Sequence, residues 1–212
     1  MGLFVLRIRA VCALIFGLVL AAHLSASSLD HHLVDIISLD QTFVCDIRYA
    51  TANNFTGQVL YPSTRCLLVE PAARALAGVQ QQLKAVGLGL KVWDAYRPLS
   101  VQQLMWDNFP QFHAYIGNPA VGSKHNRGAA VDLTLVDLAT GQELAMPTGF
   151  DDLSERAHRR YPHTPLQARA NCYLLEILMV AAGFEPLPHE WWHFNWHAWA
   201  EYPLLDVVAE SI

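Results

Sequence analysis

Residue types that could do chemistry are densest near the C-terminus, where the chain reads HEWWHFNWH from His189 to His197. The first five residues match H-E-x-x-H, in which two histidines one helical turn apart bind zinc and the glutamate acts as the base. That use of the motif requires a helix. Pro186 and Pro188 lie just before it, and the aromatic residues that follow are weak helix formers. The longer H-E-x-x-H-x-x-G-x-x-H form is also missing, so the segment predicts a strand after a loop.

A second group of metal-binding residue types lies about 60 to 70 residues upstream, in the stretch SKHNRGAAVDLTL. It has the pattern S-x-H-x-x-G-x-A-x-D, which runs from Ser123 to Asp132 and includes His125. A histidine and a carboxylate on either side of a glycine turn are suitable ligands for Zn²⁺, and His193 can supply a third. Three protein ligands leave one position for water, as a catalytic site needs, and Glu190 would then be the base beside it.

These two motifs, in this order, resemble those of the D-alanyl-D-alanine dipeptidases of the vancomycin-resistance type. That family is related to the zinc D,D-carboxypeptidases and to the hedgehog signalling domain. The zinc motifs alone indicate only the superfamily, whereas D-A-Y-R-P and Y-A-T-x-N-N-F-T-G indicate the dipeptidase branch. The resemblance covers roughly residues 33 to 205. Its blocks are IRYATANNFTG (47–57), VWDAYRP (92–98), RGAAVDLTL (127–135), GFDDLSERAH (149–158) and GFEPLPHEWWHF (183–194).

The resemblance implies a role for each matching residue. The zinc ligands would be His125, Asp132 and His193, with one Zn²⁺ per chain. Glu190 would be the general base and proton shuttle, and Arg97 would stabilise the oxyanion of the tetrahedral intermediate. The substrate-binding residues would be Ser123 for the carboxylate, and Tyr49 and Asp151 for the free ammonium group. The resemblance gives His189 no role.

Each assignment has a plainer alternative. Arg97 could be a surface arginine paired with Asp94, and Asp132 could cap a turn. Asp151 and Asp152 are adjacent, and either could cap the stretch that follows; we expect Asp151 to face the substrate. Tyr49 could be a core residue and Ser123 a turn residue. The tryptophans of the C-terminal motif are expected to pack in the core rather than to bind sugars.

Three stretches are predicted to be helical. Residues 69–87 carry apolar side chains at helical spacing and end at a glycine, and a second helix is expected to begin at Pro98 in its first position. A third covers 164–183, where Thr164 and Gln167 fit a capping-box pattern.

Strands are expected over 90–98 and from Ala130 onward. The second strand alternates, so that one face is apolar and the other, which includes Asp132, is small and polar; this predicts a half-buried strand that forms a cleft wall. Because helices and strands do not alternate regularly, we expect an α+β fold. It would be a single domain with a mainly antiparallel sheet, helices packed on one side, and the zinc site in a cleft on the sheet.

The first 26 residues have two arginines, a short apolar run and small residues before Ala26, which predicts a cleaved signal peptide. The apolar run is shorter than the roughly 20 residues of a membrane-spanning helix. The mature domain, 27–212, would have 186 residues (212 minus 26) and a formal charge of −7, since the two arginines lost reduce the charge of −5 by two. No basic run is present, which argues against nucleic acid as a partner. We expect a secreted or periplasmic protein without a stable membrane anchor.

Three cysteines remain after cleavage, and none forms a C-x-x-C pair, so a thiolate zinc site has no support. Cys45 and Cys66 could form a disulfide in an oxidising compartment, and the sequence leaves this question open. Cys172 lies in an apolar helical stretch and is expected to be a buried thiol.

Three functions are consistent with these observations. The first is zinc-dependent hydrolysis of the D-Ala-D-Ala dipeptide, for recycling of cell-wall peptide or for breakdown of a wall precursor. The second is a zinc D,D-carboxypeptidase that trims peptidoglycan stem peptides. The third is a non-catalytic zinc module that binds wall peptides, which Glu190 argues against because such a module needs no base.

Overall fold

The computed structural model describes residues 32–61 and 63–208 of the protein, and these described residues belong to one compact unit. The expected signal peptide lies outside the described residues. Within the part of the chain that is described, no helix combines the length and the apolar character needed to cross a membrane.

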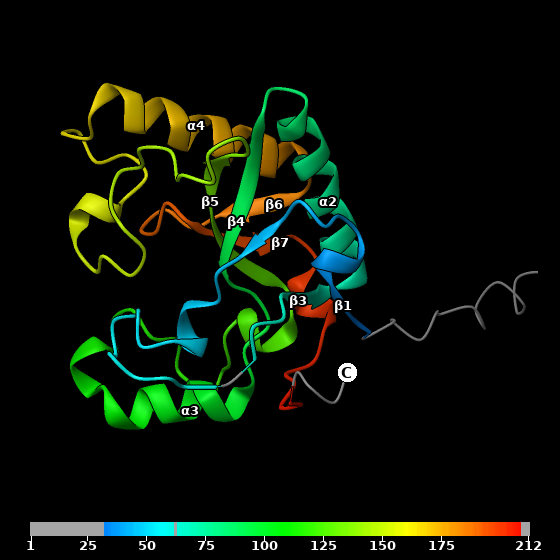
Figure 1. Ribbon diagram of the computed structural model, residues 1–212. Coiled ribbons are helices and arrows are strands. Elements are labelled where there is room, and N and C mark those ends of the chain that lie inside the picture. The colour runs from blue at the N-terminus through cyan, green and yellow to red at the C-terminus, as the bar shows by residue number, and fades with distance from the viewer. Residues whose placement is uncertain (1–31, 62, 209–212) are drawn as a thin grey trace, which may run out of the picture. The chain divides into compact units, whose positions relative to one another are not determined.

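A five-stranded sheet in the order β2-β4-β5-β7-β6 forms the centre of this unit (Figure 1). Only the contact between β2 and β4 is parallel, and the other three are antiparallel. A second, two-stranded sheet pairs β1 with β3. The strands are β1 (Leu33–Asp35), β2 (Val44–Cys45), β3 (Leu67–Val69), β4 (Leu88–Asp94), β5 (Ala130–Asp137), β6 (Phe184–Pro186) and β7 (His193–Trp196).

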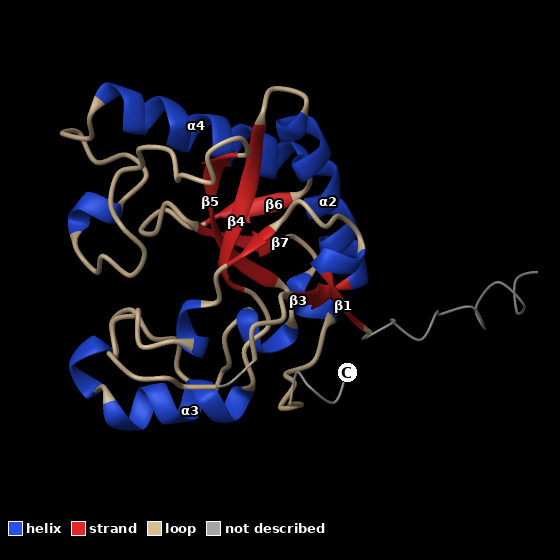
Figure 2. Cartoon of the chain, in the orientation of Figure 1, coloured by secondary structure: helices blue, strands red, loops and turns tan. Residues whose placement is uncertain are grey.

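Two of the helices cover one face of the five-stranded sheet (Figure 2). Helix α2 (Glu70–Lys84) packs against β3 and β4, α4 (Leu166–Ala181) packs against β5 and β6, and the two helices touch each other. Helix α3 (Leu99–Asn108) lies apart from them and belongs to a small separate apolar cluster with Tyr49 and Ile116. The expected α+β class, with a mainly antiparallel sheet, is confirmed; α3 is the helix that does not share the common face.

The predicted starts of two helices were each one residue too early. Pro98 and Pro165 are the residues before α3 and α4, with ψ values of 145° and 144°, which are extended rather than helical. The capping box predicted at Thr164 is therefore wrong: its hydroxyl donates to the Tyr161 carbonyl oxygen, and α4 has no side-chain cap. The glycine that closes α4, Gly183, has a φ of +93°, as the sequence predicted for a helix end.

Strand β5 is more deeply buried than its alternating sequence predicted. Every residue from Ala130 to Val136 is buried, including Asp132 and Thr134 on the polar face. The prediction of a half-buried strand was wrong because the polar face is covered by loops from other parts of the chain. The segment HEWWH is not helical, as expected: turns lie at 188–189 and 191–192, Glu190 lies between them, and His193 begins β7.

The three described cysteines are free thiols, so Cys45 and Cys66 are not joined in this structure. Cys66 is fully buried, and burial raises the pKa of its thiol, with the Cys45 thiol as its neighbour. Cys172 is buried on α4, as expected.

Candidate metal and catalytic site

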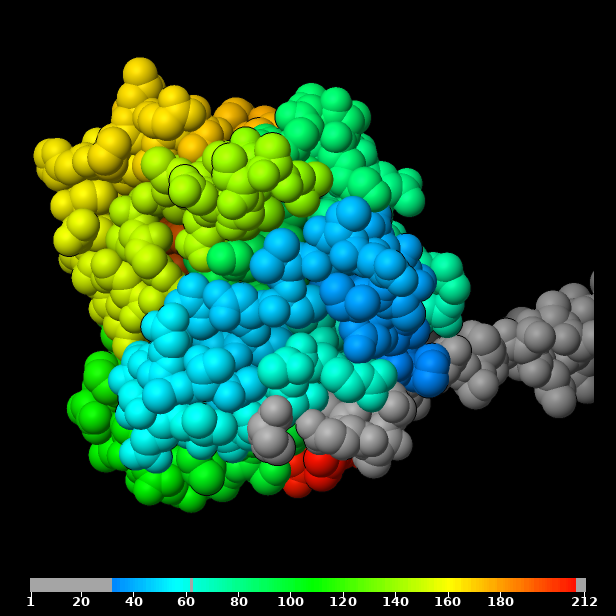
Figure 3. Space-filling view, viewed as in Figure 1, coloured from blue at the N-terminus to red at the C-terminus, as the bar shows by residue number. Residues whose placement is uncertain are grey.

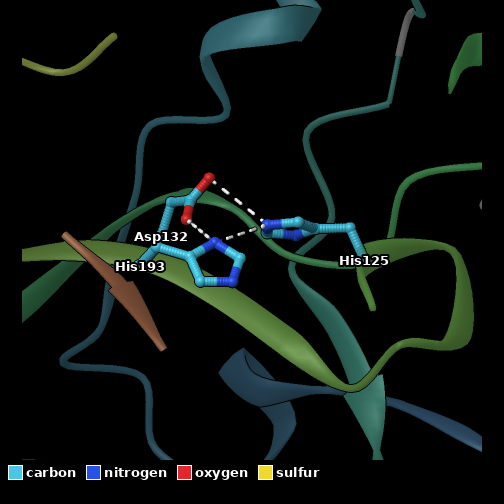
Figure 4. A group of neighbouring side chains, drawn as sticks. All are labelled: His125, Asp132 and His193. Atoms are coloured by element: carbon cyan, nitrogen blue, oxygen red, sulfur yellow. Dashed lines mark hydrogen bonds and ion pairs between the residues drawn. The ribbon is translucent and has the colours of Figure 1, made fainter. Parts of the chain in front are cut away.

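The residues His125, Asp132 and His193 converge from three segments (Figure 4). His125 begins a short 3₁₀ turn before β5, Asp132 lies on β5, and His193 is paired directly with Asp132 across the β5–β7 ladder. The Nδ1 atom of His193 lies 2.9 Å from one carboxylate oxygen of Asp132, and Nε2 of His125 lies 3.4 Å from the other. The two ring nitrogens are 3.3 Å apart. One ligand atom from each of the three residues lies within 4.8 Å of the ligand atoms of the other two.

A glycine makes this convergence possible. Gly128 ends the turn that begins at His125, with a left-handed φ of +63°. A Cβ atom there would lie 2.3 Å from a methyl carbon of Leu33 and 3.3 Å from the backbone nitrogen of Val69, so another residue would push the Leu33 side chain aside and strain the left-handed backbone. The glycine of the S-x-H-x-x-G-x-A-x-D motif therefore lets the chain turn sharply between the two ligands.

Hydrogen bonds to the outer nitrogens fix both histidine rings. His125 Nδ1 lies 2.7 Å from the Ala95 carbonyl oxygen, and His193 Nε2 lies 2.9 Å from the Asn195 side-chain oxygen. Both partners are acceptors, so each ring carries its proton on that outer nitrogen. His125 Nε2 and His193 Nδ1 consequently face Asp132, and each offers a lone pair to a metal ion once no proton lies between ring and carboxylate. Two oriented imidazoles and a carboxylate form a donor set suited to a divalent metal ion.

The charges of the three groups are strongly coupled. Burial opposes the negative charge of Asp132, but the neighbouring His125 and His193 rings lower the pKa of its carboxyl. Burial likewise opposes a positive charge on His193, and the carboxylate of Asp132 nevertheless raises its pKa above the usual value. A bound cation would take the place of the proton that this pairing otherwise retains.

Glu190 lies in the turn just before β7. Its carboxylate is 3.8 Å from His193 Nδ1, on the side where the ligand atoms converge. Burial raises the pKa of Glu190 above its ordinary value. A carboxylate with a raised pKa next to a metal site is well suited to accept and return a proton near neutral pH.

Arg97 is buried and held from several directions. Its guanidinium forms a hydrogen-bonded ion pair with Asp94, and its Nη1 donates to the Gln102 side-chain oxygen over 2.9 Å. Its central carbon lies 4.7 Å from the ring centre of Tyr49. Burial opposes its charge, but Asp94 raises the pKa of the guanidinium. The pairing with Asp94 that the sequence suggested does occur, yet in the interior at the wall of the cleft rather than on the surface.

Asp151 lines the same cavity as the metal-binding group. The Tyr49 hydroxyl lies 3.2 Å and 3.3 Å from its two carboxylate oxygens, and the Phe55 backbone N–H lies 3.5 Å away. Figure 3 shows the segment that contains Tyr49 and Phe55, in cyan, beside the segment that contains Asp151, in yellow-green. Burial, together with the charge of Asp132, raises the pKa of Asp151 to about 8. Asp152, by contrast, accepts hydrogen bonds from Ser154 in an exposed turn.

Ser123 takes part in the turn that precedes His125. Its side-chain oxygen accepts the His125 backbone N–H over 3.3 Å, and its own N–H donates to Asn126. Ser123 also lines the cavity, so its turn role and a substrate role are compatible. His189, in contrast, is exposed and lies against the ring of His158.

All of the predicted site residues line one cavity of about 200 Å³, below the usual range of about 300–1,000 Å³ for drug-sized ligands. It has room for a small molecule only. The cavity also has apolar walls, from Phe55, Met105, Ile116 and Leu187. Two residues that support the site were missed by the sequence reasoning: Gln102, which holds Arg97, and Asn195, which orients His193. The spacing of Asn195, two residues beyond His193 on a strand and so on the same face, was a signal that could have indicated it.

A cluster of two histidines and an aspartate beside a half-buried glutamate and a buried arginine is typical of a metallopeptidase. The sequence model of the D-ala-D-ala dipeptidase family matches residues 29–204. The chain is 40% identical to the D-alanyl-D-alanine dipeptidase of Escherichia coli K12 over 82% of its own length and 89% of that protein. The D-alanyl-D-alanine dipeptidase of Enterococcus faecalis is 34% identical over 71% of this chain and 84% of its own. The chain belongs to the D-ala-D-ala dipeptidase family, and the resemblance stated from its motifs is confirmed.

A weaker structural likeness is to the LdcB LD-carboxypeptidase, whose structure reveals the molecular basis of peptidoglycan recognition by that protein. It covers 61% of this chain and 59% of that chain, with a TM-score of 0.42 and 19% sequence identity.

Proposed function

We propose that this protein is a zinc-dependent dipeptidase that hydrolyses D-Ala-D-Ala to two molecules of D-alanine. The observation that carries this proposal is the distribution of charge in the small cavity. The cavity wall combines a half-buried carboxylate, Asp151, with a metal-binding group that has its own base, Glu190. Family membership supports the same conclusion.

His125, Asp132 and His193 would hold the metal ion through the two oriented ring nitrogens and the carboxylate. Two imidazoles and one carboxylate match a catalytic zinc site, which keeps a position for water. Bound there, Zn²⁺ would act as a Lewis acid and lower the pKa of a bound water to about 7.

The protein's own groups account for the proton transfers. Glu190 accepts the proton of the attacking water on its carboxylate and then delivers it to the amine that leaves when the peptide C–N bond breaks. Arg97 donates hydrogen bonds to the oxygen that becomes negative when the carbonyl carbon is attacked. Its fixed position, held by Asp94 and Gln102, means that little reorganisation accompanies this step.

The remaining residues define the ends of the substrate. Asp151 and the Tyr49 hydroxyl would receive the free ammonium group, and Ser123 would hold the carboxylate of the second alanine. A longer, acylated peptide has no ammonium group at this position. It would leave the half-buried Asp151 carboxylate without a cationic partner, which is costly, so the arrangement favours a dipeptide over the stem peptide of a carboxypeptidase.

The first 26 residues support export, and an exported enzyme would act in the cell envelope on dipeptide released from the wall. Such an enzyme would not reach a cytoplasmic precursor pool, which argues for peptide recycling rather than antibiotic resistance.

The test is hydrolysis by the purified protein, with and without a chelator, of D-Ala-D-Ala, L-Ala-L-Ala and an N-acylated D-Ala-D-Ala peptide. We expect chelator-sensitive release of D-alanine from the first substrate only, restored by Zn²⁺. Cleavage of the acylated peptide alone would support the carboxypeptidase instead, and zinc binding without any hydrolysis would support the non-catalytic module.

A further inference from the structure

Besides the residues that face the cavity, one buried arginine makes an unusual set of contacts behind it. The β6–β7 loop, Leu187–Trp192, carries Glu190 and leads directly into His193. Arg159 lies behind this loop with only 3% of its side chain exposed. Its Nε donates to the Leu187 carbonyl oxygen over 2.8 Å, and its Nη2 donates to the His193 carbonyl oxygen over 2.7 Å. One guanidinium therefore joins the two ends of the loop.

The backbone on either side strengthens this connection. The Arg159 N–H donates to the Pro188 carbonyl oxygen over 3.1 Å, and the Trp191 N–H donates to the Ala157 carbonyl oxygen over 3.1 Å. The loop is thus attached along its length to the segment 157–159, which follows the Asp151 segment in the chain. The position of Glu190 and His193 relative to Asp151 depends on this attachment.

Stability alone is a poor explanation for such a residue. Burial lowers the pKa of Arg159 to about 10, so the guanidinium is still charged at neutral pH. Its acidic neighbour, Glu176, lies 3.6 Å from Nη1, and that nitrogen has no hydrogen-bond partner among the described residues. A buried charge with incomplete pairing is usually less favourable than apolar packing. The guanidinium provides two hydrogen-bond donors at a fixed spacing in one plane. Its central carbon lies 4.2 Å from the ring centre of Phe194.

We propose that Arg159 is a positioning residue that pre-organises the β6–β7 loop, so that the metal ligand His193 and the base Glu190 are in place before the metal ion and the substrate bind. The inference rests on the proposed function, in which these two residues have those roles. Without the fork, the loop must be ordered when the metal binds, and that entropy cost weakens the binding. Loss of such an outer partner typically reduces metal affinity by about 10- to 100-fold.

The neighbouring Arg160 offers a matched control. It is 68% exposed at its side chain and bonds to the same Glu176, but it makes no hydrogen bond to the loop. The experiment compares the wild-type protein with the Arg159→Lys and Arg160→Lys variants. Zinc affinity is measured by competition with a chromophoric chelator, and the visible absorption of bound Co²⁺ reports the ligand geometry. Lysine keeps the charge but cannot reach both carbonyl oxygens with fixed geometry.

We expect zinc affinity to fall at least about 10-fold in Arg159→Lys, with an altered Co²⁺ spectrum, and to change less than about twofold in Arg160→Lys. A third variant, Leu76→Ala, destabilises the core from α2, which packs on β3 and β4. It is expected to lower the melting temperature without changing zinc affinity, and so separates general destabilisation from positioning. Unchanged affinity and spectrum in Arg159→Lys, or an equal loss in Leu76→Ala, would overturn the proposal.

Amide hydrogen exchange of the metal-free wild-type protein tests the same idea even if Arg159→Lys does not fold. We expect the Leu187 and Trp191 amides to be protected without metal, since they donate to the backbone carbonyl oxygens of His193 and Ala157, and neither oxygen is a metal-binding atom. Fast exchange of both amides would contradict pre-organisation. If no protein, including the wild type, binds zinc, the proposed function fails, and the exchange result still decides whether the loop is ordered without metal.

Discussion

The substitution Asp151→Asn separates the role of this carboxylate in binding from its effect on stability. Asparagine has nearly the same shape and tolerates the left-handed backbone found here, where φ is +56°. It keeps an oxygen that can accept the Tyr49 hydroxyl, but it removes the negative charge. The variant should therefore fold, and its differences from the wild type should come from charge.

The sign of the stability effect follows from the pKa. Burial raises the pKa of Asp151 from 3.8 to about 8, so the folded protein retains a proton that the unfolded chain loses between these values. The stability that Asp151 contributes is fully present below about pH 4 and is lost as the pH rises toward 8. At pH 7 the pH is about three units above the pKa of Asp151 in the unfolded chain, so the loss of folding stability is on the order of 4 kcal/mol. We expect the metal-free Asp151→Asn variant to be more stable than the wild type by up to about that amount at pH 7, and by little at pH 4.

The assay is urea unfolding of both proteins in chelator at several pH values from 4 to 8. Asp152→Asn is the control, because it removes the same charge from an exposed turn whose hydrogen bonds asparagine can keep. In parallel, kcat/KM for D-Ala-D-Ala should fall about 10- to 100-fold in Asp151→Asn, since a hydrogen bond to a charged group contributes roughly 1.5–3 kcal/mol. Equal stability of Asp151→Asn and the wild type at pH 7, or unchanged dipeptide hydrolysis, would refute the reasoning.

Three further predictions concern the metal ligand, the base and the oxyanion-binding arginine. His193→Ala should lose stoichiometric zinc and activity, whereas His189→Ala should keep both, because only His193 faces the other two ligands. Metal analysis after dialysis measures this, and loss of zinc in His189→Ala would instead support the helical zinc-protease interpretation of the motif. Glu190→Gln should bind zinc normally but lose at least about 100-fold in kcat. In the wild-type pH profile of kcat/KM, the acid limb should lie above the ordinary glutamate pKa, because burial raises the pKa of Glu190. Arg97→Lys should lower kcat by about 100- to 1000-fold with little change in KM, and a change confined to KM would contradict its role at the oxyanion.

Much of the site could be read from the chain because its ligands sit in short, distinctive patterns. His125 and Asp132 are seven residues apart around a glycine turn, and His193 follows Glu190 by three residues, so local backbone geometry nearly determines how each pair lies. The prolines before the C-terminal motif also excluded the helical zinc-protease arrangement, and the structure has a turn and a strand there.

The supporting contacts could not be read in the same way. Arg159 and His193 are 34 residues apart, and Tyr49 and Asp151 are 102 residues apart, so only the packing of distant segments brings them together. Sequence alternation predicted which face of β5 is polar, but it carried no information about the loops that bury that face. The burial of Asp94 and Arg97 escaped prediction for the same reason.

By itself, the sequence determined the family, the fold class and the residue types that can hold a metal, because these depend on local spacing and on short motifs. Tertiary structure decided which nitrogen of each histidine faces the metal site, the raised pKa of Asp151 and Glu190, and the small size of the cavity. Those properties depend on burial and on the distances between charges, and both are set only when remote segments pack around the site.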